Sequence, residues 1–221
     1  MPAPNALRRL APERLRDDPR LRAIALGTGL IPPRPMHSDN EAAVLTRLAR
    51  GARCVVELGV YEGSSAVMLC RALGPDAELH LIDPFIDPVG ASLRAGWRAN
   101  PTATRLAVRR ANPRNGPTIH WHIARSQDVG RGWADGAVDV LFIDGDHSAT
   151  GCREDWDVWH GHVAPSGAVA FHDARDGIPG GRGGPGPTGV VDELFRHGTS
   201  EWEISDEIDS LVVVRRKMLS G

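Results

Sequence analysis

Cysteine is scarce in this chain of 221 residues, which contains only Cys54, Cys70 and Cys152. The three are odd in number, lie far apart and have apolar or helical neighbours, so no disulfide framework is implied. We interpret them as small core residues of a protein from a reducing compartment. A chain of this length can bury one continuous core without disulfides or a structural metal, so we expect a single domain.

Long apolar runs and an excess of basic charge are also absent. No stretch of about 18 apolar residues occurs, as a membrane span would need, and the N-terminal stretch MPAPNALRRLAPERLRDD lacks the apolar region of a secretory signal. The formal net charge is −2, and Lys217 is the only lysine, so no basic surface for nucleic acid or an anionic membrane is indicated. We therefore expect a cytoplasmic protein that binds neither nucleic acid nor membrane.

The chain instead alternates short apolar runs with helical patterns. The runs are CVVELG, ELHLID, TIHWHI, VDVLFID and AVAFHD, and the helical patterns cover residues 63–73, 90–112 and 150–161. A further helix, capped by Ser38 or Asp39, precedes the first run. This alternation predicts a parallel sheet with crossover helices on both faces. Residues 201–217 hold two strand-like runs joined by a short acidic turn, which predicts an antiparallel hairpin at one sheet edge.

We therefore expect the α/β fold class, with a Rossmann-like, doubly wound and mostly parallel sheet of seven strands that ends in the hairpin. This domain would span residues 36–221. A helical and extended segment over residues 1–35 would precede it, with a helix near residues 12–26. Glycines and prolines dominate residues 176–189, where we expect a loop without regular structure beside the end of the fifth strand.

Two glycines, Gly59 and Gly63, follow the first apolar run, where they would allow close backbone approach to a ligand above the next helix. Their G-x-x-x-G spacing differs from the G-x-G-x-x-G of dinucleotide sites, so NAD fits poorly. Glu57, an acid at the end of the run, suits a cationic ligand such as a sulfonium amino acid. Asp83 closes the second run, where a carboxylate can accept hydrogen bonds from ribose hydroxyls.

Metal-ligating side chains follow the fourth and fifth runs. Asp144, Asp146 and His147 come directly after the fourth, and His172 and Asp173 directly after the fifth. The two strands are neighbours in the usual sheet order, so these groups can converge. Carboxylates favour Mg²⁺, whereas a participating histidine would shift the preference toward Mn²⁺, Fe²⁺ or Zn²⁺.

The motifs VVELGVYEGSSAVMLCRAL, ARSQDV, VDVLFIDGDH and AVAFHDA together resemble class I S-adenosylmethionine-dependent O-methyltransferases, of the catechol O-methyltransferase type, over residues 36–174. The resemblance implies S-adenosylmethionine as the cofactor and a divalent cation, Mg²⁺ first, as the metal. It implies cofactor contacts at Met36, Glu57, Gly59, Tyr61, Gly63, Ser65, Asp83, Ser126, Gln127 and Asp144. It also implies metal ligands at Asp144 and Asp173.

The sequence departs from that family at two positions. Ala174 stands where the family has an asparagine ligand, and His172 stands where a bacterial branch, resembling the cephalosporin-modifying methyltransferases, has an acid. His172 is therefore a candidate third metal ligand. His147 stands where the family has a catalytic lysine, and a hydroxyl needs a base or a cation to become a nucleophile. We predict that His147 and Asp144 are catalytic, with His147 as general base. Alternatively, His147 caps the next helix or joins the metal ligands.

The predicted function is methyl transfer from S-adenosylmethionine to a hydroxyl of a small molecule, such as a sugar or phenol of bacterial natural-product biosynthesis. One alternative treats D-G-D, residues 144–146, as the metal-binding D-x-D of a glycosyltransferase. Another is a non-catalytic S-adenosylmethionine-binding protein whose metal site is lost, as Ala174 suggests. A third keeps the enzyme but transfers methyl to nitrogen or works without metal.

Other residues of these chemical types have structural explanations. Trp156 and Trp159 recur at helical spacing with Cys152 and predict a core stripe. His120 and His122 lie in the third strand, where we assign them no chemistry. A homodimer formed through the N-terminal helix or the edge hairpin is a hypothesis for the assembly.

Overall fold

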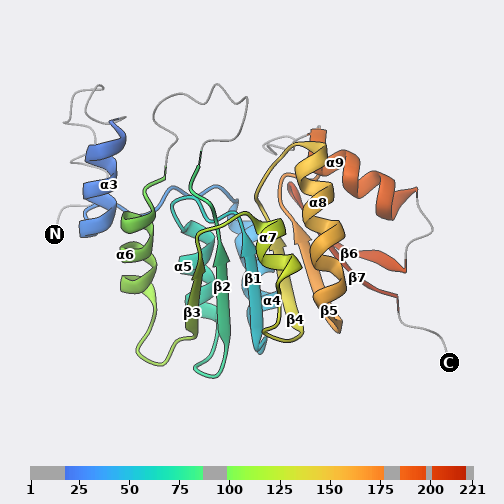
Figure 1. The fold of residues 1–221 in the computed structure, drawn as a ribbon, viewed down its shortest axis with the longest axis horizontal. Helices are drawn as coiled ribbons and strands as arrows, with labels where there is room; N and C mark the ends of the chain where they lie inside the picture. Colours follow the sequence, from blue (N-terminus) through green and yellow to red (C-terminus); the bar gives the residue numbers. More distant parts are fainter. Residues whose placement is uncertain (1–17, 87–98, 177–184, 198–200, 218–221) are drawn as a thin grey trace.

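One sheet of seven strands organises the computed structural model, which describes residues 18–86, 99–176, 185–197 and 201–217 (Figure 1). The strands are β1 (Cys54–Leu58), β2 (Glu78–Ile82), β3 (Thr118–His122), β4 (Val138–Ile143), β5 (Val163–Phe171), β6 (Trp202–Ile208) and β7 (Leu211–Arg216). Their order across the sheet is β3-β2-β1-β4-β5-β7-β6. β1 to β5 pair in parallel, and β7 is antiparallel to both β5 and β6. The predicted α/β sheet with a C-terminal antiparallel hairpin is confirmed.

Helices cover both faces of this sheet (Figure 1). They are α3 (Pro19–Thr28), α4 (Asp39–Ala49), α5 (Ser64–Ala72), α6 (Pro101–Ala111), α7 (Ser126–Arg131), α8 (Ala149–Trp159) and α9 (Pro185–Val191). A 3₁₀ turn (His160–His162) follows α8, and a π-helical turn (Asp192–Arg196) follows α9. No helix in the described ranges is long and apolar enough to cross a membrane.

The core has two parts, one on each face of the sheet. α4, α5 and α6 pack around a cluster that contains Val55, and α8 and α9 pack around a cluster that contains Val56. These two valines are neighbours in β1, and successive strand residues point to opposite faces. All of β1 is buried, which explains why its sequence is a continuous apolar run rather than an alternation.

α3 lies at the periphery, where it packs on α6 through Leu26, Ala103 and Ala107. Its N-cap is Asp18, whose carboxylate accepts hydrogen bonds from Arg20 N and Leu21 N. The helix predicted near residues 12–26 therefore corresponds to α3, which runs two residues further along the chain. Residues 12–17 of that prediction lie outside the described residues.

The expectation of no regular structure over residues 176–189 is wrong at its end, where α9 begins at Pro185. Prolines 185 and 187 lie in the first helical turn, where backbone N–H groups need no intrahelical acceptor. Gly186 permits close contact with the start of α8, since a Cβ there would lie 2.2 Å from the carbonyl oxygen of His147. Packing on α8 thus supports a helix that composition alone disfavoured. Residues 177–184 lie outside the described ranges.

Candidate active site

The candidate site lies at the carboxyl ends of β1, β2, β4 and β5. These strands are parallel and contiguous in the sheet, in the order β2-β1-β4-β5. Residues that follow each strand therefore gather at one edge of the sheet. The structure brings into one region the side chains predicted from four separate motifs.

Glu57 is fully buried near the end of β1. One carboxylate oxygen accepts a hydrogen bond from Ser65 Oγ in the first turn of α5. The other, Oε2, is buried with no hydrogen-bond partner among the described residues. Burial raises the pKa of Glu57 well above its usual value, although the Ser65 hydrogen bond acts in the opposite direction. A cationic group beside Oε2 would supply the missing interaction and favour the carboxylate.

Backbone conformation and close neighbours both require glycine at positions 59 and 63. Their φ angles are 87° and 85°, in the left-handed region that favours glycine. A Cβ on Gly59 would lie 2.1 Å from the carbonyl oxygen of Asp144, and one on Gly63 would lie 2.8 Å from Val108 Cγ2. These contacts are with the residue that follows β4 and with α6. The predicted approach of both glycines to a ligand stays a prediction.

Asp83 anchors the turn between β1 and α5. Its Oδ2 accepts hydrogen bonds from Val60 N at 2.9 Å and Tyr61 N at 2.8 Å, and its Oδ1 accepts one from Phe85 N at 2.6 Å. Tyr61 itself has a positive φ of 52°, which these bonds hold in place. A carboxylate offers about four acceptor sites, so one more hydrogen bond, for example from a ribose hydroxyl, can be accepted.

Ser126 and Gln127, the predicted adenine contacts, converge on a residue that sequence reasoning missed. Ser126 Oγ and Gln127 Nε2 both donate to Asp155 Oδ1, the latter at 2.9 Å. Asp155 lies in α8 and is 1% exposed. Burial raises the pKa of Asp155 to about 6, against the opposing effect of the Ser126 hydrogen bond. The only sequence signal was an acid in a helix beside the apolar stripe that we predicted for the core.

The groups after β4 and β5 form a second cluster. Asp144 Oδ1 lies 2.9 Å from His172 Nδ1 and 3.2 Å from His147 Nε2. Asp173 Oδ2 lies 3.5 Å from His147 Nδ1, and Asp173 Oδ1 lies 3.7 Å from His172 Nδ1. One ligand atom from each of Asp144, His147 and His172 lies within 4.8 Å of the others, close enough to share a metal ion. The structure therefore brings together all four residues predicted for metal binding and proton transfer.

Mutual attraction favours the charged forms of Asp144, His147 and His172, whereas burial raises the pKa of Asp173. Burial opposes ionisation of Asp144, but the charge of His172 and the two histidine hydrogen bonds outweigh it and lower the pKa of Asp144 to about 2. Burial likewise opposes protonation of His172, but Asp144 raises the pKa of His172 to about 11. The hydrogen bond with Asp144 raises the pKa of His147 as well. These shifts favour an ionised Asp144 beside a protonated His172 when no metal is bound.

Glu41 supports this cluster from behind, a role that sequence reasoning missed. Its Oε1 accepts hydrogen bonds from Ser210 N at 2.8 Å and Ser210 Oγ at 2.6 Å, and its Oε2 accepts one from Ser38 N at 2.7 Å. Oε2 also lies 3.6 Å from His172 Nε2. Ser210 Oγ lies 3.1 Å from Asp173 Oδ1 and thus links Glu41 to the other side of the cluster. In the sequence Glu41 is only an acid close to the predicted helix cap, whereas α4 and the β6–β7 turn place it at the site.

Met36 lies half-buried in the segment between α3 and α4. Arg34 N donates to Glu62 Oε2 at 2.8 Å, and His37 Nε2 lies 3.3 Å from Ser64 Oγ. These contacts hold the segment over the start of α5, the region predicted to receive the methionine part of the cofactor. The contact of Met36 with the cofactor stays a prediction.

Comparison with known proteins places this arrangement in a family. The model of the family described as "Methyltransferase domain" matches residues 56–174. No curated protein matches the chain by sequence. Solved structures with a similar fold include the O-methyltransferase TomG from Streptomyces achromogenes, involved in tomaymycin synthesis and bound to SAM. It is 17% identical, with a TM-score of 0.60 over 97% of this chain and 95% of that one.

Two further structures share the fold. The O-methyltransferase from Bacillus cereus in complex with SAH is 14% identical, with a TM-score of 0.58 over 88% of this chain and 89% of that one. CalS11, a TDP-rhamnose 3'-O-methyltransferase of calicheamicin biosynthesis, is 12% identical, with a TM-score of 0.56 over 93% of this chain and 95% of that one. At these identities the likeness shows a common fold.

Proposed function

The chain belongs to the methyltransferase-domain family, and from this premise we propose that it is an O-methyltransferase that uses S-adenosylmethionine and a divalent cation. Its substrate would be a small natural-product sugar or phenol with a free hydroxyl. The observation that carries the proposal is the placement, at the carboxyl ends of the parallel strands, of a buried carboxylate beside a cluster of carboxylates and histidines. One oxygen of that carboxylate has no hydrogen-bond partner among the described residues. The likeness to TomG and CalS11, both of natural-product biosynthesis, supports this substrate class.

The residues of the chain fit the proposed cofactor. Glu57 Oε2 would accept a hydrogen bond from the cationic amino group of S-adenosylmethionine, which would end its isolation. Asp83 keeps an acceptor site for a ribose hydroxyl, and Ser126 and Gln127, which begin α7 after β3, would contact the adenine. The bound cofactor would supply the methyl group. The protein's own task is to orient the two reactants for an in-line displacement.

Asp144, His172 and Asp173 would hold the divalent cation. Two carboxylates admit Mg²⁺, our first choice, and the participating imidazole admits Mn²⁺, Fe²⁺ or Zn²⁺ as well. His172 would replace the ligand that Ala174, fully buried here, cannot provide. The cation would lower the pKa of a bound hydroxyl.

His147 would accept the proton of that hydroxyl. Its side chain is 41% exposed, compared with 19% for Asp144, 12% for Asp173 and 3% for His172, so it is the member of the cluster that a substrate can reach. Its two ring nitrogens face Asp144 and Asp173, which orient the ring. A base held in this way is typical of proton transfer in catalysis.

The D-x-D alternative loses support in the structure. Asp146 Oδ1 accepts a hydrogen bond from Ser148 N at 2.8 Å, in the turn that begins α8, and not from the cluster around Asp144. Asp146 therefore helps to start a helix, which leaves one carboxylate of the D-x-D pair at the candidate metal centre.

The proposal is tested first by calorimetric titration of S-adenosylhomocysteine into the wild-type protein and into the Glu57→Gln and Asp83→Asn variants. Glu203→Gln is the matched control, because Glu203 is exposed on β6. We expect binding that weakens in both site variants and is unchanged in the control. A folded wild-type protein that binds a nucleotide sugar but not S-adenosylhomocysteine would refute the proposal.

A second experiment tests catalysis and metal dependence. Hydroxyl-bearing sugars and phenols are screened for methylation with Mg²⁺ or Mn²⁺, and then after exhaustive chelation. We expect activity that chelation abolishes and that Asp144→Asn reduces. Cofactor binding without turnover, together with unchanged metal affinity in Asp144→Asn, would favour the non-catalytic alternative, and activity that survives chelation would show that no metal is needed.

A further inference from the structure

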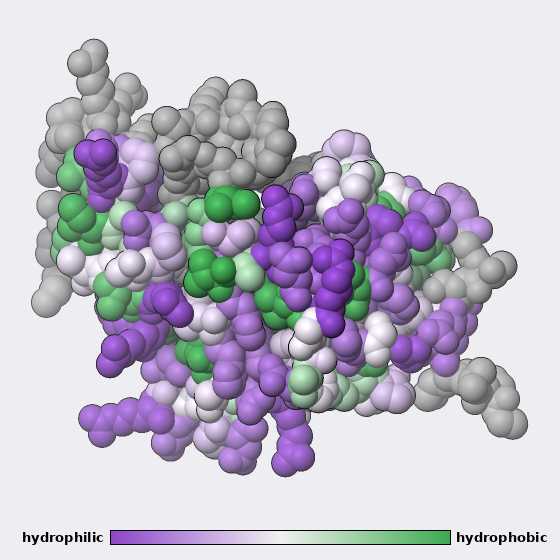
Figure 2. All heavy atoms as spheres, viewed as in Figure 1, coloured by the Kyte–Doolittle hydropathy of each residue, from purple (hydrophilic) through white to green (hydrophobic). Residues whose placement is uncertain are grey.

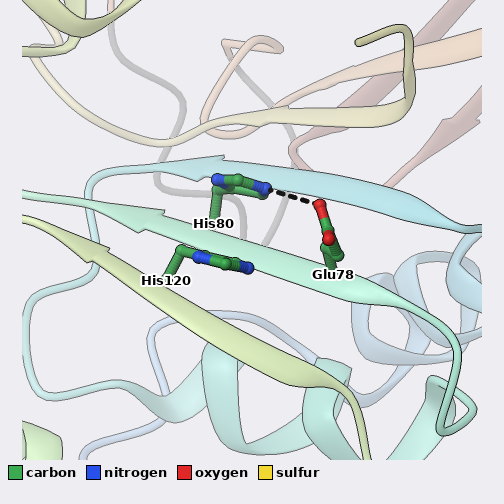
Figure 3. A group of neighbouring side chains, drawn as sticks. All are labelled: Glu78, His80 and His120. Carbon is green, nitrogen blue, oxygen red and sulfur yellow. Dashed lines mark ion pairs between the residues drawn. The ribbon is translucent and has the colours of Figure 1, made fainter. Parts of the chain in front are cut away.

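A second group of candidate metal ligands lies at the far edge of the sheet, on β2 and β3. Figure 3 shows Glu78, His80 and His120, which we name the β2–β3 cluster. β3 is the terminal strand of the sheet, and His80 pairs directly with His120 in the register between the two strands. Glu78 lies two residues before His80 and therefore on the same face. The cluster shares no residue with the candidate active site.

Two buried ring nitrogens in this cluster lack hydrogen-bond partners among the residues that the structure describes. His80 is 1% exposed, and its Nε2 finds no such partner within the described part of the chain. His120 Nε2 is also buried and likewise has no hydrogen-bond partner among the described residues. Leaving a buried polar atom unsatisfied costs about 1–3 kcal/mol, so two in adjacent side chains call for a ligand.

The spacing of the cluster fits a metal ion better than hydrogen bonds. His80 Nε2 lies 3.5 Å from Glu78 Oε2, which is longer than a good hydrogen bond. Two ligands bound at about 2.1 Å in a tetrahedral site are separated by roughly 3.4 Å, close to this distance. Candidate ligand atoms of Glu78, His80 and His120 all lie within 4.8 Å of one another. The rings of His80 and His120 are stacked with their centroids 4.5 Å apart, so binding one ion through both rings would require them to rotate out of this stack.

The surroundings favour the ligating form of His80. Its Nδ1 lies 3.2 Å from His122 Nε2, and the ring of Trp133 packs edge-on with the centroids 4.7 Å apart. Burial and the neighbouring His120 lower the pKa of His80. When Nδ1 donates to His122, the lone pair of Nε2 faces the Glu78 carboxylate. A cation between these two groups would turn a repulsion into two coordinate bonds.

We propose that Glu78, His80 and His120 bind a transition-metal dication, with Zn²⁺ as the preferred ion, and that this ion ties β3 to β2. Two imidazoles and one carboxylate match Zn²⁺ and not Mg²⁺, which prefers oxygen ligands. The side chain of Glu78 is 48% exposed, so the ion enters from solvent at the sheet edge. Water would complete the coordination.

The test uses an Asp144→Asn background, which disables the metal centre proposed for catalysis and isolates the β2–β3 cluster. Zn²⁺ affinity and stoichiometry are measured by competition with a chromogenic chelator, and coordination is followed by the visible absorption of Co²⁺. We expect one equivalent of Zn²⁺ in this background. Adding Glu78→Gln or His120→Gln should weaken its binding roughly tenfold or more, because loss of an outer-shell partner alone typically costs that much.

The matched controls are Glu203→Gln and His197→Gln, which make the same substitutions at exposed positions outside both clusters. They should leave Zn²⁺ affinity and the Co²⁺ spectrum unchanged. Glu78 is exposed and His120 half-buried, so the test variants keep the core intact, and circular dichroism checks their folding. Failure of the Asp144→Asn protein to bind Zn²⁺, or unchanged affinity in either cluster variant, would overturn the proposal. The result does not depend on S-adenosylhomocysteine binding and so stands apart from the proposed function.

Discussion

Replacement of Glu57 by glutamine should make the ligand-free protein more stable and the cofactor complex weaker. Glu57 is 0% exposed, and its Oε2 has no hydrogen-bond partner in the described ranges. Glutamine has nearly the same shape and retains an oxygen that can accept the hydrogen bond from Ser65 Oγ. The substitution therefore removes a titratable group from the core without opening a cavity.

The magnitude follows from proton linkage. The carboxyl of Glu57 ionises near its ordinary pKa of 4.5 in the unfolded chain, whereas burial raises the pKa well above this value in the folded protein. Above pH 4.5 the folded state holds a proton that the unfolded state releases, so folding stability falls as pH rises toward the folded-state pKa. Each pH unit in this window costs the wild-type protein about 1.4 kcal/mol, and the Glu57→Gln protein does not incur this loss.

The assay is urea unfolding of both ligand-free proteins at pH of about 5, 6 and 7, with the difference in unfolding free energy plotted against pH. We expect this difference to grow in favour of Glu57→Gln, by up to about 1.4 kcal/mol per unit, until the pH reaches the folded-state pKa of Glu57. The exposed Glu203→Gln control should show a difference that stays constant. A Glu57→Gln difference that does not change over the same range, or that favours the wild-type protein throughout, would show that Glu57 is not held in its neutral form.

Other predictions concern the turn after β1 and the base. Gly59→Ala should lower the free energy of unfolding by about 3 kcal/mol or more, and Gly51→Ala by only about 1 kcal/mol. Both glycines have a positive φ, but only at Gly59 would a Cβ clash with backbone atoms of another segment. Urea unfolding measures both values. Arg22→Met should lower the free energy of unfolding by about 3 kcal/mol, because it removes the two 2.5 Å hydrogen bonds to the buried carboxylate of Glu62. Adding Glu62→Gln to this variant should recover part of the lost stability. Equal stability of the wild-type and Arg22→Met proteins would disprove this prediction. His147→Gln should lower kcat about 100-fold or more while S-adenosylhomocysteine affinity holds, and an unchanged kcat would remove His147 as the base.

Much of the fold could be predicted because its local signals agree with its tertiary contacts. The CVVEL run is apolar at nearly every position because β1 is covered on both faces, and this pattern identifies a central parallel strand. The start of α4 was predicted from Ser38 or Asp39 as its cap, and Ser38 is the N-cap, since a helix needs side-chain acceptors at its first turn. α9 escaped prediction because Pro185, Gly186 and Pro187 are unfavourable to helices by composition, and its contact with the start of α8 is not visible in the local sequence.

The candidate site, like the fold, could be predicted from the sequence only in part. The sequence placed Asp144, His147, His172 and Asp173 after two strands that turned out to be neighbours, and parallel strands bring such residues to one edge. It did not indicate Asp155 as the partner of Ser126 and Gln127, because that contact joins two helices that are distant in the chain. Nor could it show that Gly59 accommodates the backbone at the end of β4, a contact that exists only when the sheet has formed.

The order of elements, the parallel sheet and the residues at the strand ends follow from the sequence alone, because hydrophobic periodicity and turn chemistry act over a few neighbouring residues. Only the tertiary structure decided the partners of each polar group. It placed Glu41 behind His172 from a distant helix and aligned His80 with His120 across two strands, and it left one oxygen of Glu57 without a hydrogen-bond partner in the described part of the chain. Such pairings depend on register and packing between remote segments, and burial, which sets the charge of each group, exists only once those segments have come together.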